Sequence, residues 1–314
     1  MKKNSQKWKD FEVTLQNPQA NPDHLAELYI ELTDDLSYAQ TYYENSNTAI
    51  YLNTLTSSVH QLIYKNKKEN KNRFIQFWKK ELPLLAGKYH KQFLYSFIVF
   101  AISCTIGAIS AKYDPSYVRL ILGDSYVNMT LENIKNGDPM GVYKDEGELS
   151  MFFYITINNI KVSLATFVVG VLGSFGTGYL LFNNGIMLGS FQYFFHEHNL
   201  LFTSALTIWI HGTLEISCII IAGAAGFVMG NSLLFPGTYS RLESFKRGAK
   251  DGMKIAIGIV PIIITAGFLE SFATRHTEWP IALKISIISI SVFFIIYYFI
   301  IYPFRLNLKH HGTN

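Results

Sequence analysis

The chain has 314 residues, of which 49% are hydrophobic and 16% are charged, whereas about 25% of the residues in a typical soluble protein are charged. This composition excludes a disordered chain, a secreted disulfide scaffold and an ordinary soluble enzyme. A formal net charge of +4 is too small to indicate a nucleic-acid-binding protein. Acidic residues are scarce between Val162 and Pro303. We therefore predict an all-α, polytopic helical membrane protein with a polar N-terminal region.

Residues 1–90 are predicted to form a cytoplasmic helical region. Apolar residues recur at spacings of three or four within 22–44 and within 48–65, which places them on one face of each helix. A shorter helix is expected around Trp8 and Leu15. We expect the three helices to pack as a small bundle, and the alternative is that a face binds a partner. The two faces consist of Leu25, Leu28, Leu32, Leu36, Ala39 and Tyr43, and of Leu52, Leu55, Val59 and Leu62.

The last part of this region, residues 65–91, mixes basic side chains with large apolar ones. Such a mixture is typical of an amphipathic helix that lies on an anionic cytoplasmic leaflet. The alternative is a positively charged flank of the first membrane span. The basic residues that we assign to the membrane surface are Lys79, Lys80, Lys88 and Lys91.

The rest of the chain is predicted to be a transmembrane domain, residues 91–304, followed by a cytoplasmic tail, residues 305–314. A hydrocarbon core of about 30 Å requires roughly 20 apolar residues in a helix. Five segments meet this length, and they are 93–111, 162–182, 206–229, 255–273 and 281–302. A sixth apolar segment, within 185–200, is too short for an upright span. It is expected to be a short crossing helix or a re-entrant hairpin.

Basic residues predict the orientation of the spans. The 13 Lys and Arg residues within 1–91 place the N-terminus in the cytoplasm, and the acid-rich connection after the first span fits an extracytoplasmic segment, 112–157. The basic loop 231–254 and the tail also fit the cytoplasm, which requires one crossing at 185–200. We therefore predict about six spans with both termini cytoplasmic. Five spans and a re-entrant loop are the alternative.

Small residues are concentrated in the predicted spans. They allow helix backbones to approach closely where lipid provides no hydrophobic drive. The alternative is a gap for a ligand or a permeating ion. The asparagine pairs 158–159 and 183–184 are expected to satisfy the backbone at helix ends. The residues assigned to helix packing or turns are Gly170, Gly173, Asn184, Gly185, Gly223 and Gly226.

Three ionisable residues fall at membrane depth: His211, Glu215 and Glu270. Charge there costs about 2.5–3.5 kcal/mol on insertion scales, so such residues usually face protein or water and have a role. His211 and Glu215 are four residues apart and share a helix face. All three are expected in the outer half of the membrane, where they could meet. Lys284 lies near a span end and is expected to reach the interface.

Three readings of this intramembrane polar cluster compete. The cluster could join helices to one another, with Glu215 either protonated or paired to His211. It could instead form a proton- or ion-coupled pathway, or supply the metal ligands of an intramembrane hydrolase. The spacing lacks the His-Glu-x-x-His pattern of zinc proteases, and neither a Gly-x-Ser-x-Gly elbow nor a Walker loop occurs. We therefore assign no catalytic residue and no cofactor. The metal ligands, if there are any, would be His211, Glu215 and Glu270.

Several motifs resemble the stage II sporulation protein M family of membrane proteins, over roughly residues 5–275. The most specific is His211-Gly212-Thr213-Leu214-Glu215, which an Ala/Gly-rich stretch follows at 219–226. The supporting motifs are Asn184-Gly185 with Gly189, Phe235-Pro236-Gly237, and Leu269-Glu270-Ser271-Phe272-Ala273-Thr274. The long N-terminal region and the 112–157 segment set the chain apart from the short sporulation type.

The resemblance implies a protein of the bacterial cytoplasmic (inner) membrane that is not itself an enzyme. The member that gives the family its name acts in septal peptidoglycan remodelling by anchoring and recruiting cell-wall hydrolases. We accordingly expect a scaffold or recruiter in the cell envelope, with the lipid bilayer and envelope proteins as partners, no nucleic acid, and a possible homo-oligomer. The alternatives are an ion- or solute-coupled transporter or channel and an intramembrane metal-dependent hydrolase.

Overall fold

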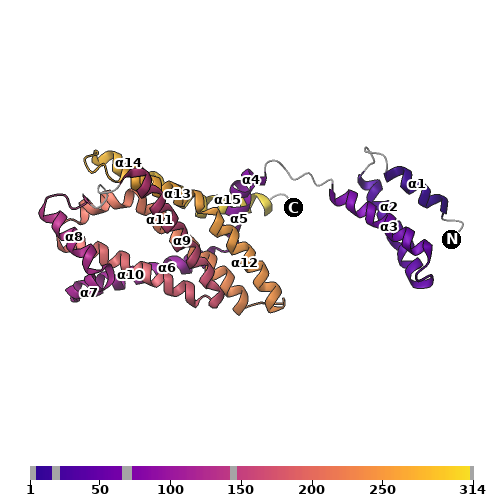
Figure 1. The fold of residues 1–314 in the computed structure, drawn as a ribbon, viewed down its shortest axis with the longest axis horizontal. Coiled ribbons are helices and arrows are strands. Elements are labelled where there is room, and N and C mark those ends of the chain that lie inside the picture. The colour runs from indigo at the N-terminus through magenta and orange to yellow at the C-terminus, as the bar shows by residue number, and fades with distance from the viewer. Residues whose placement is uncertain (1–4, 16–21, 66–72, 142–146, 312–314) are drawn as a thin grey trace. The chain divides into compact units, whose positions relative to one another are not determined.

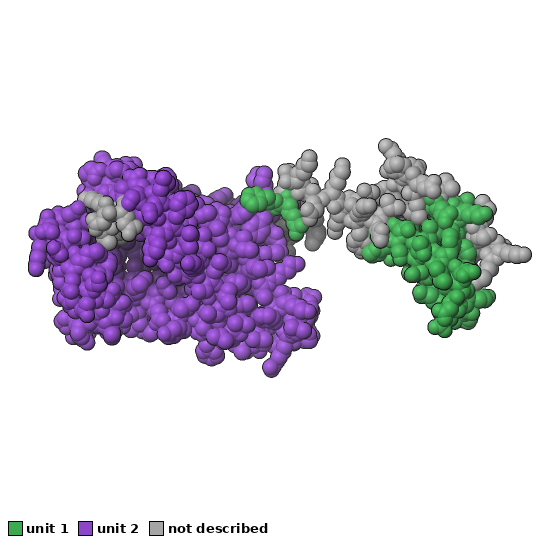
Figure 2. Space-filling model, viewed as in Figure 1, with its two compact units in different colours: residues 1–74 green, residues 75–314 purple. Residues whose placement is uncertain are grey.

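A computed structural model describes the chain except for residues 1–4, 16–21, 66–72, 142–146 and 312–314 (Figure 1). The described residues form helices and contain no strand, which confirms the predicted all-α class. The chain divides into two compact units, residues 1–74 and residues 75–314 (Figure 2).

The first unit consists largely of three helices, α1 (Ser5–Leu15), α2 (Pro22–Tyr42) and α3 (Asn47–Lys65). They agree with the three helices that the spacing of apolar residues predicts. The side chains that form their shared core are Trp8, Phe11, Leu32, Leu36, Ala39, Ala49, Leu52, Leu55 and Val59. The predicted faces therefore pack against each other. Among the described side chains of these faces, Tyr43 is an exception, because it follows the end of α2 and is 44% exposed. The side chains of Leu25 and Leu62 lie outside the described residues.

The basic segment that enters the second unit forms α4 (Arg73–Gln76), a π-helical turn η1 (Phe77–Glu81) and α5 (Leu82–Lys88). The apolar side of α5 is covered by protein. Leu82 is fully buried in the core of the second unit together with Ile255.

Polar contacts hold this segment against later helices. Trp78 Nε1 donates a hydrogen bond to the Gly258 carbonyl oxygen at 3.1 Å. Lys88 pairs with Asp251 at 2.7 Å, and Glu81 pairs with Lys254. The apolar side of α5 thus packs on protein, whereas Phe74 and Ile75 of α4 are exposed, and both interpretations of the segment stay predictions. Lys79, Lys80, Lys88 and Lys91 are exposed, and their contact with a membrane surface remains a prediction.

Five helical stretches are long and apolar enough to cross a membrane. Two of them are single helices, His90–Tyr113 (α6) and Leu201–Leu234 (α11). The stretch Glu148–Leu172 consists of α9 (Glu148–Val168) and a 3-10 turn, η3 (Val169–Leu172), and the stretch Arg241–Ala273 consists of α12 (Arg241–Gly258), α13 (Val260–Phe268) and a π-helical turn, η4 (Leu269–Ala273). The stretch Ile281–Leu306 consists of α14 (Ile281–Ile296), a π-helical turn, η5 (Tyr297–Ile301), and the start of α15 (Tyr302–His311). They establish a membrane protein with several spans. α11 lies among α6, α9, α10, α12, α13 and α14.

The prediction of a second span over 162–182 is wrong. That segment straddles a turn at Gly173 and Ser174, whose φ angles are +63° and +70°. The chain then forms one helix, α10 (Phe175–Glu197), of 23 residues, or about 35 Å at 1.5 Å per residue. The short segment predicted within 185–200 is therefore mostly the second half of α10. Hydropathy did not reveal the boundary because apolar residues continue on both sides of the turn.

Asn184 and Gly185 lie within α10 and not at a turn. The Asn184 Nδ2 donates to the Leu180 carbonyl oxygen at 2.8 Å, one helical turn earlier. The expectation that asparagines 158–159 mark a helix end is also wrong, because both lie inside α9. Asparagine pairs are typical of helix ends, but here both pairs lie inside continuous helices, α9 and α10.

Part of the connection after α6 is helical, with α7 (Pro115–Leu122) and α8 (Asp124–Lys135). Asp114 caps α7, because its Oδ1 accepts hydrogen bonds from the Ser116 hydroxyl at 2.6 Å and from the Ser116 backbone N–H at 2.9 Å. These bonds stabilise the carboxylate and lower the pKa of Asp114. The last residues of the predicted 112–157 segment, from Glu148, already belong to α9.

Glycines bring α6 and α10 into close contact. A methyl group added to Gly189 would overlap the Cys104 carbonyl oxygen, and one added to Gly185 would overlap the Ser103 side chain. On α6, Gly107 lies equally close to the Ile186 backbone. Such small-residue contacts provide dispersion and weak polar interactions between helices in lipid.

The other assigned glycines lie at similar contacts, except for one in a turn. A methyl group on Gly223 would meet Ser96 and Leu181, and Gly170 and Gly226 lie against each other. Gly173 lies at the turn before α10 and adopts a positive φ, which other residues rarely adopt.

Gly189→Ala is expected to destabilise the second unit by about 1–3 kcal/mol, the usual cost of overpacking. Gly178→Ala is the matched control, because Gly178 lies in the same helix and has open space where its methyl group would be. The control should be neutral or more stable, by up to about 1 kcal/mol. Thermal unfolding of the full chain in detergent measures both. Equal melting temperatures would contradict the close contact between α6 and α10.

Candidate functional site

Helix α11 presents a polar stripe inside the second unit. Thr207, His211 and Glu215 follow each other at intervals of four residues, so they lie along one face of the helix. His211 is only 4% exposed. The stripe therefore faces neighbouring helices.

Glu270 reaches the same place from the end of the span Arg241–Ala273. It lies in the π-helical turn η4, where the Thr274 backbone N–H donates to the Leu269 carbonyl oxygen at 2.9 Å, five residues earlier. A π-turn inserts one extra residue into a helix and is frequent at functional sites.

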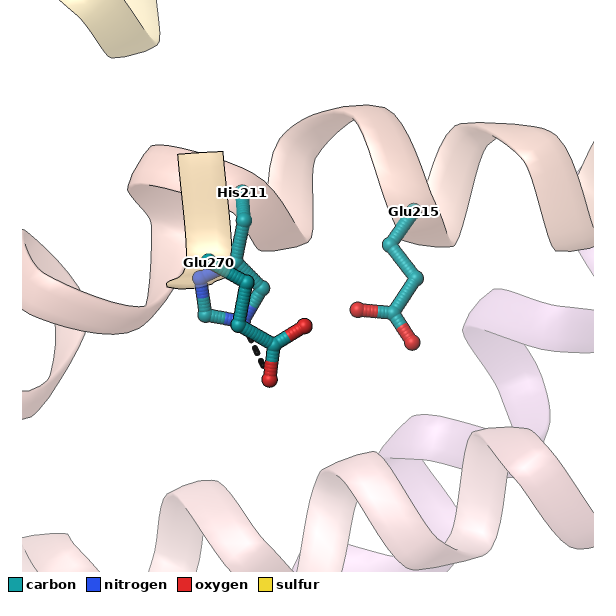
Figure 3. A group of neighbouring side chains, drawn as sticks. All are labelled: His211, Glu215 and Glu270. Carbon is teal, nitrogen blue, oxygen red and sulfur yellow. Dashed lines mark ion pairs between the residues drawn. The ribbon is translucent and has the colours of Figure 1, made fainter. Parts of the chain in front are cut away.

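The three ionisable residues predicted to meet do converge (Figure 3). His211 Nε2 and Glu270 Oε1 are 3.7 Å apart. One ligand atom from each of His211, Glu215 and Glu270 lies within 4.8 Å of the other two. Figure 3 shows the Glu215 carboxylate turned toward the Glu270 carboxylate. Two acids and one imidazole thus share one small volume, although their function stays a prediction.

A hydrogen-bonded chain orients the imidazole. Thr274 Oγ1 donates to the Leu269 carbonyl oxygen at 3.2 Å and lies 2.9 Å from His211 Nδ1. When the Thr274 hydroxyl gives its one proton to the Leu269 carbonyl oxygen, its oxygen is left to accept from Nδ1 in the second contact, which corresponds to the Nδ1–H tautomer. The neutral ring then carries its proton on Nδ1. Its Nε2 lone pair is directed toward Glu270.

Helix α9 contributes buried polar groups to the surroundings of the cluster. Asn159 is 8% exposed, lies beside the Glu215 side chain, and has no hydrogen-bond partner for its Nδ2 among the described residues. The hydroxyls of Thr156, on α9, and of Thr207 are also buried without a partner in this part of the chain. Buried polar groups are normally paired, so these groups call for a further ligand or water.

Sequence reasoning missed the groups that support the cluster. Thr274 follows the Leu-Glu-Ser-Phe-Ala motif directly, but nothing in a single sequence indicates that its hydroxyl meets His211. Thr207 could have been found, because it precedes His211 by four residues. Lys284 is 6% exposed, and its Nζ donates to the carbonyl oxygen of Thr277 at 2.8 Å, in the loop that precedes the span Ile281–Leu306; that this side chain reaches the membrane interface stays a prediction.

The fold and the cluster define a polytopic helical membrane protein that contains a buried His–Glu site. Residues 96–275 match the family described as Stage II sporulation protein M. Because this match covers more than half of the chain, the chain belongs to the stage II sporulation protein M family. Residues 1–65, within the first unit, match the Domain of unknown function (DUF8413). No curated protein and no solved structure gives a match.

Thr274→Val is expected to destabilise the protein by about 1–3 kcal/mol, because it leaves the buried His211 Nδ1–H without its acceptor. Thr265→Val is the matched control. Thr265 is exposed on α13, and its hydroxyl bonds the Pro261 carbonyl oxygen of its own helix, so its loss should cost less than about 0.5 kcal/mol. Thermal unfolding in detergent compares the two variants. A drop of the same size in both would contradict the role of Thr274.

Proposed function

We propose that the protein is a non-enzymatic scaffold of the bacterial inner membrane that recruits cell-envelope partners, including peptidoglycan-remodelling proteins. Membership of the stage II sporulation protein M family supports an integral membrane role. The observation that carries the recruiting role is the first unit, which has a core of its own and matches a family of its own. A scaffold needs such a module to bind a partner independently of the spans.

The first unit has an aromatic surface that suits protein binding. Tyr38 and Tyr42 of α2 are 59% and 66% exposed, and their ring centroids are 4.6 Å apart. Ile30 and Ile50 are also exposed. Tyrosines are enriched at interfaces because they combine a large apolar area with a polar hydroxyl. The aromatic pair is therefore the first candidate contact for an envelope partner that meets the protein on its cytoplasmic side.

The double variant Tyr38→Ser/Tyr42→Ser is expected to recover at least about 10-fold less of the partners that bind the cytoplasmic first unit than the wild type, because interface tyrosines are frequent hot spots. Affinity purification of the full chain in mild detergent measures this. Tyr113→Ser is the control, because Tyr113 is 78% exposed but lies outside the first unit. Repeated recovery of the wild type without any envelope protein would count against the scaffold.

The proposed topology has six crossings, with α10 as the third and both termini in the cytoplasm. The length of α10, about 35 Å, is sufficient to cross the hydrocarbon core. With this crossing, the basic residues around α12 lie on the cytoplasmic side of the membrane, as residues 1–90 do.

Cysteine labelling of intact cells tests this topology. With a membrane-impermeant maleimide, Asn136→Cys is expected to react from outside, whereas Thr238→Cys should react only after the membrane is permeabilised. Both positions are exposed. The wild type measures the background from Cys104 and Cys218. Labelling of Thr238→Cys in intact cells would instead support five crossings.

A further inference from the structure

We propose that His211, Glu215 and Glu270 together bind one divalent transition-metal ion, for which Zn²⁺ is the reference ion. The ligands would be His211 Nε2 and one carboxylate oxygen from each glutamate. The ion would join α11 to η4. This inference does not depend on the proposed scaffold function.

The spacing of the three ligand atoms suits one ion after a small contraction. Zn²⁺ binds nitrogen and oxygen ligands at about 2.0–2.2 Å, which puts tetrahedral ligands roughly 3.4 Å apart. His211 Nε2 and Glu270 Oε1 are already 3.7 Å apart, and the full set lies within 4.8 Å. Glu215 has three rotatable side-chain bonds, and its carboxylate already points into the cluster (Figure 3). A change of side-chain torsions therefore completes the geometry.

Charge balance favours a divalent ion. Two carboxylates and a neutral imidazole carry a total charge of −2, which a divalent ion cancels. Uncompensated charge in a membrane-embedded site is costly. The donor set of one imidazole nitrogen and two carboxylate oxygens suits Zn²⁺, Mn²⁺ or Fe²⁺, whereas Ca²⁺ prefers oxygen ligands alone.

The surroundings have the features of a metal site. Ligating histidines usually donate their second ring N–H to an oxygen acceptor, which fixes the tautomer, and His211 Nδ1 makes this contact with Thr274. Independently, the Asn159 amide is buried and interacts with the Glu215 side chain, while its Nδ2 has no partner within hydrogen-bond distance among the described residues. That amide is placed to bond a carboxylate oxygen that has turned toward the ion, or a water in the fourth position.

Metal analysis of the full chain in detergent tests the proposal. After dialysis against a weak chelator, we expect about one Zn²⁺ per wild-type chain and a higher melting temperature with Zn²⁺ than without it. Glu215→Gln and Glu270→Gln should each weaken Zn²⁺ binding at least about 100-fold, because each removes a ligand. Thr274→Val should weaken it by about 10–100-fold, the usual effect of a supporting residue.

Glu132→Gln is the matched control, because Glu132 is exposed on α8, and it should bind like the wild type. Zn²⁺ far below one per wild-type chain, or equal binding by the ligand variants and the control, would overturn the proposal. If a ligand variant fails to fold, X-ray absorption of the wild type still decides. One imidazole and otherwise oxygen ligands are expected, whereas sulfur ligands would show adventitious binding to Cys104 or Cys218.

Discussion

The absence of water from the bilayer core is the constraint on which the second unit depends. Helices there gain nothing from burying apolar side chains that lipid would cover equally well, so they must associate through close contact and paired polar groups. α11 shows the result most fully, because 78% of its apolar window is buried, against 11% for Ile281–Leu306. Gly223 and Gly226 allow its neighbours to approach. The small residues are thus the reason that one span can be enclosed by the others.

Enclosure of α11 dictates what its polar residues can do. His211 and Glu215 face neighbouring helices, and Glu270 in η4 and Thr274 directly after it lie next to His211. A cluster whose only purpose was to join helices would be expected to pair its polar groups fully. Here the Nδ2 of Asn159 has no partner within hydrogen-bond distance among the described residues, although the amide interacts with the Glu215 side chain; this incomplete pairing is the reason that we propose a bound ion in addition to helix packing.

The sequence was informative where a repeating spacing carried the signal. The helical faces of the first unit, the positions of four spans and the meeting of His211 with Glu270 all follow from periodicity and from the cost of charge in lipid. The turn at Gly173 and Ser174 was not predictable, because no drop in hydropathy marks it. Thr274 and Asn159 depend on contacts between distant segments, which a single sequence does not contain.

The span Arg241–Ala273 contacts both the basic segment before α6 and the polar cluster on α11. Only half of its apolar window is buried, yet polar contacts hold it at several places, one of them the hydrogen bond from Trp78 to the Gly258 carbonyl oxygen. Near its start, Asp251 and Lys254 pair with the basic segment that precedes α6. Near its end, Glu270 and Thr274 meet His211 on α11. Neutralising Glu270 alone leaves the contact between Thr274 and His211 in place, so only the loss of both contacts would detach this end of the span from α11.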